Sequence, residues 1–243
     1  MNASANTKVV AEETTPRRPD PGAAGWRESK WLAVAELGLV VLIFVADAHH
    51  LVPFSKTPFL VLLGTISLWV RRVGWRAIGL TRNRTWAKTL ALGFVLGLLM
   101  EALELFVTQP FLVRVLHKQP DFSVFRSVTG NWKLTLLFIA LAWILAAFGE
   151  EMVYRGYLMN RVADLLKRTR TAWIISLFAV NIGFGMAHGY QGITGLIDEG
   201  LMGVLLGVMY LRTGRNLAVP IVAHGVADTV DFLLIFIGKY PGV

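Results

Sequence analysis

The stretch LAWILAAFGEEMVYRGY, residues 141–157, places two carboxylates and a guanidinium inside an apolar run. The charged residues are Glu150, Glu151 and Arg155. A charged side chain within a bilayer is costly unless it is paired or faces a cavity, so such residues are rare and commonly functional. The stretch therefore predicts a membrane helix with a charge cluster in its interior.

The composition of the whole chain agrees with a membrane protein. Of its 243 residues 55% are hydrophobic and only 16% are charged, against about 25% charged in ordinary soluble domains. The apolar residues fall in long runs, which predicts an all-α, polytopic membrane helical bundle of about seven transmembrane helices. The chain has no cysteine, which excludes disulfides, thiolate metal sites and a cysteine nucleophile.

Seven apolar runs mark the expected spans, and the second of them is short. They cover residues 31–48, 57–71, 87–109, 132–158, 171–188, 193–212 and 216–238. Residues 1–30 are polar, contain proline and lack the pattern of a secretory signal, so we expect a disordered cytoplasmic tail. We expect N-terminal membrane helices over 31–131 and a catalytic core over 132–238.

The basic residues indicate how the chain crosses the cell membrane. With the N-terminus in the cytoplasm, 17 of the 24 Lys and Arg residues fall on the cytoplasmic side and six on the other. Cytoplasmic loops carry an excess of Lys and Arg, so this split predicts a multi-pass protein with a cytoplasmic N-terminus. The net charge of +8 suits anionic lipid headgroups, and nucleic acid is not an expected partner.

The two glutamates are expected to have different partners. Glu151 and Arg155 are four residues apart, in the favourable order for an ion pair on one helix face. Glu150 points about 100° away around the helix and is free for proton transfer as a general base. The alternative is a buried ion-pair network that only holds helices together.

Two further elements carry histidines in later apolar runs. Phe184 and His188 lie one helical turn apart, as do His224 and Asp228, and Asp231 follows on nearly the same face. An aspartate can fix the tautomer of a nearby histidine, and His-x-x-x-Asp could equally supply two metal ligands. Each element taken alone is also explained by buried polar side chains that bridge helices.

The three elements together resemble the CAAX-protease and bacteriocin-processing (CPBP, Abi) family of intramembrane proteases. The matching motifs are Glu-Glu-x-x-x-Arg, Phe-x-x-x-His and His-x-x-x-Asn/Asp, and the resemblance covers about residues 132–232. It implies an intramembrane endopeptidase that cuts membrane-associated peptides or proteins near a membrane surface, with the bilayer and a peptide or protein substrate as partners. Family names often include the word metalloprotease.

The resemblance also implies a role for each site residue. Glu150 and His188 would activate the attacking water, and His224 and Asp228 would stabilise the oxyanion or hold the site, with Glu151 and Arg155 as the supporting ion pair. The prenyl-protein branch of the family has Asn where this chain has Asp228, and an ionised Asp cannot donate a hydrogen bond to an oxyanion.

The metal requirement separates two versions of this chemistry. A metal-free mechanism without cofactor is favoured, because His-Glu-x-x-His is absent and the ion pair occupies Glu151. In the alternative, Zn²⁺ is bound by Glu150, His188 and His224, with Asp228 as a further ligand and Glu151 as the base.

Two other functions and one geometric difficulty remain at this stage. The chain could be a non-catalytic bacteriocin-immunity or membrane partner protein, or a proton-coupled transporter. A transporter relay would use four further acids, for which packing against arginines or exposure at the membrane interface is the plainer explanation: Glu101, Glu104, Asp198 and Glu199. The rise per residue places Glu150 and His224 about 12 Å from the cytoplasmic span ends and His188 about 25 Å, so the fifth span should tilt strongly or begin later than residue 171.

Overall fold

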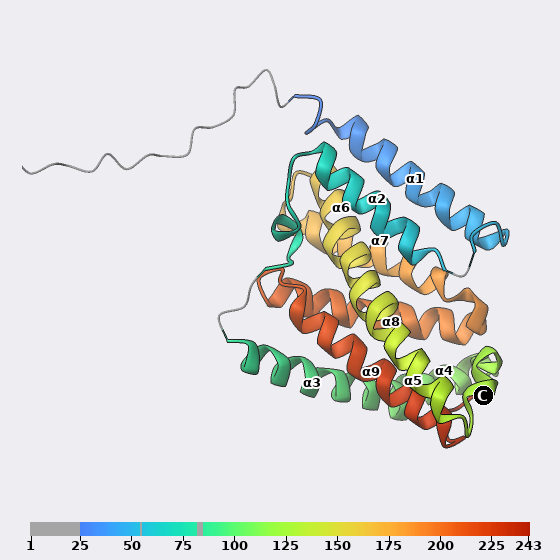
Figure 1. The fold of residues 1–243 in the computed structure, drawn as a ribbon. Coiled ribbons are helices and arrows are strands. Elements are labelled where there is room, and N and C mark those ends of the chain that lie inside the picture. Colours follow the sequence, from blue (N-terminus) through green and yellow to red (C-terminus); the bar gives the residue numbers. More distant parts are fainter. Residues whose placement is uncertain (1–24, 54, 82–84) are drawn as a thin grey trace, which may run out of the picture.

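The computed structural model describes residues 25–53, 55–81 and 85–243, so most of the predicted tail lies outside the described residues. The described chain folds into a helical bundle (Figure 1). In chain order its elements are α1 (Lys30–Ala48), α2 (Thr57–Val70), η1 (Trp75–Ile78), α3 (Trp86–Leu103), η2 (Glu104–Thr108), α4 (Gln109–Leu116), η3 (Ser123–Val128), α5 (Trp132–Leu141), η4 (Ala142–Leu158), α6 (Met159–Leu165), α7 (Arg170–Ala187), η5 (Gly189–Gln191), α8 (Gly192–Arg212) and α9 (Ala218–Phe236).

The predicted helical membrane bundle is confirmed. Within the described residues, six helical stretches are long and apolar enough to cross a membrane: Lys30–Ala48, Trp86–Leu116, Trp132–Leu165, Arg170–Ala187, Gly189–Arg212 and Ala218–Phe236. The remaining predicted span corresponds to α2, which is apolar but has only 14 residues.

The distribution of polarity suits a bundle that is surrounded by lipid. Large apolar side chains such as Trp69, Phe106 and Ile182 are mostly exposed on the outside. In contrast, Glu151, Arg155 and many other polar side chains are buried inside. A bilayer solvates apolar side chains and leaves polar groups to find partners within the protein, which explains this arrangement.

Glycines let α3 approach α9 closely. A Cβ added to Gly93 would lie 2.6 Å from Cβ of Val222, and one added to Gly97 would lie 2.5 Å from the carbonyl oxygen of Ala223. Small residues at helix interfaces allow backbones to pack closely in membranes. The Gly-x-x-x-Gly spacing in α3 therefore serves packing within this bundle and brings α3 close to α9, the helix that carries His224.

The fourth helical span is longer than predicted, and its length explains how Glu150 and His188 can lie at a similar depth in the bundle. The apolar pattern stops at Leu158, but α6 continues the helix to Leu165, so the predicted end at 158 was wrong. Counted along the helices, Glu150 lies roughly 20 Å from Leu165 and His188 about 27 Å from Arg170. Both side chains thus lie at a similar distance from the same end of the bundle.

The capping of α7 rules out the later start that was considered for that span. The Thr169 side chain accepts a hydrogen bond from the backbone N–H of Ala172 at 3.1 Å, which fixes the helix start at Arg170. The helix α9, in contrast, begins inside the bundle, because Leu217, Val219 and Pro220 are all buried. His224 therefore lies deeper than its short distance from the start of α9 suggests.

Candidate active site

One cavity brings all four predicted catalytic residues together. Its volume is about 290 Å³, and Glu150, His188, His224 and Asp228 line it. Aromatic and aliphatic side chains make up much of the rest of the wall, from η3, α5, η4 and α9, namely Phe122, Phe125, Phe138, Leu141, Leu145 and Phe232. The site is thus a group of acids and imidazoles within an apolar enclosure, where electrostatic interactions are stronger than in water.

Glu151 lies at the centre of the polar network behind the cavity. Its side chain has 0% exposure, and its Oε1 accepts hydrogen bonds from Arg155 Nη1 at 2.6 Å and from His224 Nδ1 at 3.0 Å. The predicted ion pair between Glu151 and Arg155 is therefore present. The same carboxylate also joins η4 to α9, a link that the sequence did not predict.

The guanidinium of Arg155 ties three helices together. Its Nη2 donates to Asn181 Oδ1 at 3.2 Å and to the carbonyl oxygen of Gly203 at 2.9 Å. Its Cζ lies 4.7 Å from the ring centroid of Phe184, a cation–π distance. Gly203 is required here, because a Cβ at this position would lie 3.2 Å from Nη2 and 2.8 Å from Asn181 Oδ1.

Glu150 has few partners, as the sequence predicted. Thr57 at the start of α2 donates a long hydrogen bond to its Oε1 at 3.5 Å. Its Oε2 is buried and has no hydrogen-bond partner among the described residues. Both glutamates lie in η4, which is a π-helical stretch, and such wide turns are found frequently at functional sites. Glu150 can therefore accept a proton from a group in the cavity.

His188 is held in one tautomer by the backbone. It caps the C-terminus of α7, and its Nδ1 lies 2.9 Å from the carbonyl oxygen of Phe184. A carbonyl oxygen can only accept, so Nδ1 carries a proton, and in the neutral ring Nε2 is the basic nitrogen. The ring also packs on Phe184 with 4.7 Å between centroids, which explains why the motif pairs a phenylalanine with this histidine.

His224 lies between two carboxylates. Its Nδ1 donates to Glu151 Oε1 at 3.0 Å, and its Nε2 lies 3.6 Å from Asp228 Oδ1. The predicted proximity of His224 and Asp228 on one helix face is thus present. In the imidazolium form, Nε2 carries a proton that can be donated into the cavity, while Glu151 fixes the ring orientation.

Several residues around the site were missed by sequence reasoning. Asn181 could have been found, because it lies on the same face of α7 as Phe184 and His188, two turns before the histidine. Thr57 gave no signal, since its approach to Glu150 depends on how α2 packs against η4. Gln191 was also missed; it lines the cavity and donates to Glu199 Oε1 at 3.0 Å.

The expectation that the four additional acids pack against arginines or are exposed at the membrane interface was wrong for three of them. Glu101, Glu104 and Asp198 are all buried, and neither carboxylate oxygen of Glu101 has a hydrogen-bond partner among the described residues, whereas Glu104 and Asp198 accept from hydroxyl groups. Thr108 donates to Asp198 at 2.5 Å, and Tyr240 donates a long hydrogen bond to Glu104 at 3.4 Å. Glu101 lies in α3, Glu104 in η2 and Asp198 in α8, and the buried Arg155, which bonds to α8, pairs with Glu151 instead.

The cavity lies toward one end of the bundle. Residues from the connecting segments at that end line it: Ser55 before α2, Phe122 before η3, Tyr190 in η5 and Tyr240 after α9. Figure 1 shows the end of α1 and the C-terminus at this end, and the start of α1 with the start of α3 at the other. The starts of α1, α3 and α7 carry the basic residues Lys30, Lys88 and Arg170, so the cavity lies away from the most basic end.

Comparison with known proteins gives one family match. Residues 131–230 match the family model of type II CAAX prenyl endopeptidase Rce1-like proteins. The match includes all three motifs and begins next to α5, where the predicted catalytic core also begins. No curated protein and no solved structure matches the chain.

Proposed function

Because residues 131–230 belong to the Rce1-like family of type II CAAX prenyl endopeptidases, we propose that Glu150 and His188 activate water for peptide-bond hydrolysis. At the level of the family, the protein is a CAAX-type endopeptidase of the membrane. The bacteriocin-processing (Abi) part of the resemblance stays a prediction. The observation that carries the proposal is the buried Oε2 of Glu150, which has no hydrogen-bond partner in the described part of the chain and lies in the cavity that His188 and His224 also line.

Glu150 acts as the general base in this proposal. Its carboxylate has one long hydrogen bond from Thr57 and one free oxygen, so it is available to take a proton from water. His188 orients the same water through Nε2, because its Nδ1–H is fixed on the Phe184 carbonyl. A positioned base of this kind contributes about 10²–10⁴-fold to a rate.

His224 stabilises the tetrahedral intermediate. The water oxygen bonds to the carbonyl carbon of the substrate peptide, one water proton moves to Glu150, and the carbonyl oxygen becomes an oxyanion. Nε2–H of His224 donates to this oxyanion. Glu150 then passes its proton to the leaving nitrogen as the C–N bond breaks, which yields a carboxylic acid and an amine.

Asp228, Glu151 and Arg155 support the reacting groups. Asp228 is 3.6 Å from His224 Nε2 and holds the ring from the cavity side. Glu151 holds the other ring nitrogen and is itself neutralised by Arg155. Asp228, which stands where the prenyl-protein branch of the family has Asn, therefore orients His224 and does not itself donate to the oxyanion.

The side chains do not fit the Zn²⁺ alternative well. Throughout the described residues, no three His, Asp or Glu side chains are grouped closely enough to hold one metal ion. His224 also uses Nδ1 to donate to Glu151, so only Nε2 could bind a metal ion, and in this mechanism Nε2–H is instead the donor to the oxyanion. We therefore derive no step that uses a metal ion.

Peptide cleavage by the purified protein tests this proposal. The protein in detergent is incubated with a pooled peptide library, with and without a chelator, beside Glu150→Gln and the control Glu28→Gln, which changes an exposed glutamate near the start of α1. We expect cleavage that persists with chelator, persists in Glu28→Gln and is lost in Glu150→Gln. Cleavage that is lost on chelation and restored by Zn²⁺ would overturn the metal-free mechanism.

The position of the cavity also leads to a proposal about the side of the membrane on which the substrate is cut. The excess of basic residues at the opposite end favours a cytoplasmic position for that end. In this orientation the cavity would lie nearer the outer surface. We propose that membrane-associated peptides are cut near this outer surface.

Single cysteines test this orientation, because the chain has none of its own. Lys118→Cys lies at the cavity end of the bundle and Arg212→Cys at the basic end. We expect a membrane-impermeant maleimide to label the first in intact cells and the second only after lysis. The reverse pattern would place the cavity in the cytoplasm.

A further inference from the structure

A second polar cavity lies at the basic end of the bundle, away from the candidate active site. Its volume is about 480 Å³, and it is formed by the start of α1, the end of α2, α6 and the turn before α7. Six cationic side chains and two carboxylates line it. The cations are Arg27, Lys30, Arg71, Arg161, Lys167 and Arg168, and the acids are Glu28 and Asp164.

Arg161 is the most deeply buried cation of this cavity. The residue is only 5% exposed, and its Nη2 pairs with Asp164 Oδ2 at 3.0 Å. Its Nε is buried and has no hydrogen-bond partner among the described residues. A buried guanidinium with an unused donor is costly unless an acceptor reaches it, so the cavity favours an anion with several oxygens.

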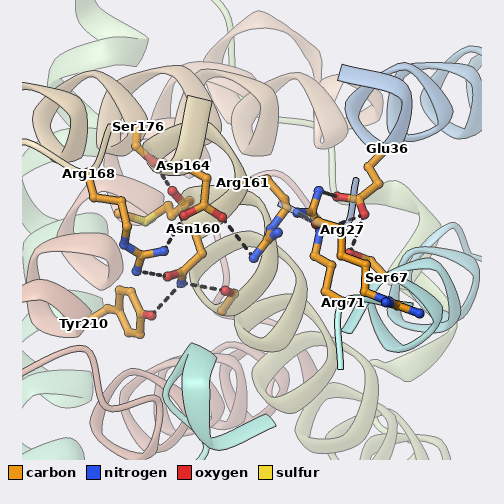
Figure 2. A network of polar contacts seen from close by, with 12 residues as sticks. Arg27, Glu36, Ser67, Arg71, Asn160, Arg161, Asp164, Arg168, Ser176 and Tyr210 are labelled. Carbon is orange, nitrogen blue, oxygen red and sulfur yellow. Dashed lines mark hydrogen bonds and ion pairs between the residues drawn. The ribbon is translucent and has the colours of Figure 1, made fainter. Parts of the chain in front are cut away.

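Two neighbouring arginines are held in place by other groups. Arg71 binds Glu36 through Nε and Nη2, both at 3.0 Å, and Arg168 Nη2 donates to Asn160 at 2.8 Å. Figure 2 shows Asp164 between Arg168 and Arg161, and Arg71 paired with Glu36 beside them. Because these side chains are fixed before any ligand arrives, binding costs little side-chain entropy.

The turn between α6 and α7 has a strained backbone at two cationic residues that line the cavity. Lys167 and Arg168 both have left-handed backbone conformations, with φ of 65° and 53°. Such values are uncommon for residues other than glycine, and strain of this kind is often found at ligand sites. The turn directs two cationic residues to the cavity wall.

An apolar groove adjoins the basic cavity between the same helices. On α1, Leu37 of the groove lies one helical turn deeper than Ala33 of the cavity, and on α6, Val162 of the groove directly follows Arg161 of the cavity. The groove has a volume of about 480 Å³, and its lining, which continues to Tyr154, is almost wholly apolar. A cationic cavity at the membrane end above an apolar groove matches the shape and polarity of a phospholipid.

We propose that the basic cavity binds the phosphate group of an anionic phospholipid and that the apolar groove holds one of its acyl chains. Basic pockets between membrane helices on the cytoplasmic side commonly bind anionic headgroups. The groove reaches Tyr154, whose ring packs edge-on against Phe184 with 4.9 Å between centroids. The bound lipid therefore contacts the helix that carries His188. The binding site itself does not depend on the proposed catalytic mechanism.

The headgroup part of the proposal is tested by lipid binding in detergent, with native mass spectrometry and the melting temperature as measurements. The probes are phosphatidylglycerol, phosphatidylcholine and inorganic phosphate. The double variant Lys30→Gln/Lys167→Gln removes two exposed cations of the cavity, and Lys88→Gln/Arg76→Gln removes two exposed cations elsewhere at the same end. We expect phosphatidylglycerol to bind best, and its affinity to fall about 25-fold in the cavity variant and less than about twofold in the control.

Two results would overturn this assignment. Equal affinity of the two double variants for phosphatidylglycerol would show that the cavity is not the headgroup site. An equal rise in melting temperature with inorganic phosphate would identify a site for soluble anions instead of a lipid.

The acyl-chain part is tested by filling the groove without changing any charge. Gly183 lines the groove and has open space where a Cβ would lie, so Gly183→Leu places a side chain in it. Gly38 in α1 also has open space but lies outside the groove, and Gly38→Leu is the matched control. We expect phosphatidylglycerol binding to weaken in the first variant only. Unchanged binding in Gly183→Leu would mean that the acyl chain lies elsewhere.

Discussion

Replacing each of the adjacent glutamates in turn separates catalysis from stability. Glu151→Gln removes the charge that neutralises Arg155, a guanidinium with 0% exposure, while Asn181 and the Gly203 carbonyl give it only neutral acceptors. Breaking a buried ion pair by removing one partner costs about 3–5 kcal/mol. For a chain of this size that corresponds to a melting temperature lower by about 6–20 °C.

Glu150→Gln should instead change the melting temperature little and lower the rate of peptide cleavage strongly. Glu150 has a single long hydrogen bond from Thr57, and its other oxygen has no partner among the described residues. An isosteric amide therefore loses little stability, and we expect a change in melting temperature below about 3 °C. Loss of the base should lower the rate of peptide cleavage by about 10²–10⁴-fold.

Thermal unfolding of both variants in one detergent, together with peptide cleavage below the melting temperature, measures these effects. The reasoning is wrong if Glu151→Gln melts like the unmodified protein, because Arg155 would then not depend on that charge. It is equally wrong if Glu150→Gln retains full cleavage, because the base would then be another group.

Substitutions at three further positions test individual contacts. His188→Ala should lower peptide cleavage by about 10²–10⁴-fold with a small change in melting temperature, because its recorded hydrogen bond is to its own helix. Asp228→Asn should retain more cleavage activity than Asp228→Ala, because an amide can still hold the His224 ring. Gly97→Leu should destabilise the protein by about 1–3 kcal/mol in thermal unfolding, because even a Cβ there would lie 2.5 Å from the Ala223 carbonyl oxygen. An equal loss in Gly38→Leu, which has open space, would contradict that explanation.

The sequence by itself determined the class of fold and the polar pairs that form within single helices. Long apolar runs must lie in lipid as helices, because the backbone has no other way to satisfy its hydrogen bonds there. The i, i+4 spacing of Glu151 with Arg155 and of His224 with Asp228 predicted pairs that are present, because these contacts depend only on local helix geometry. The motif set likewise predicted the family that residues 131–230 match.

Only the tertiary structure decided how these local pairs are joined. The hydrogen bond from His224 to Glu151, the contact of Thr57 with Glu150 and the position of Asn181 on Arg155 all link different helices. Such contacts depend on which helix faces meet, and no spacing along one helix records that. The extension of the fourth span to Leu165 was missed for the same reason, because α6 is polar in part and is stabilised by packing against α1 and α7.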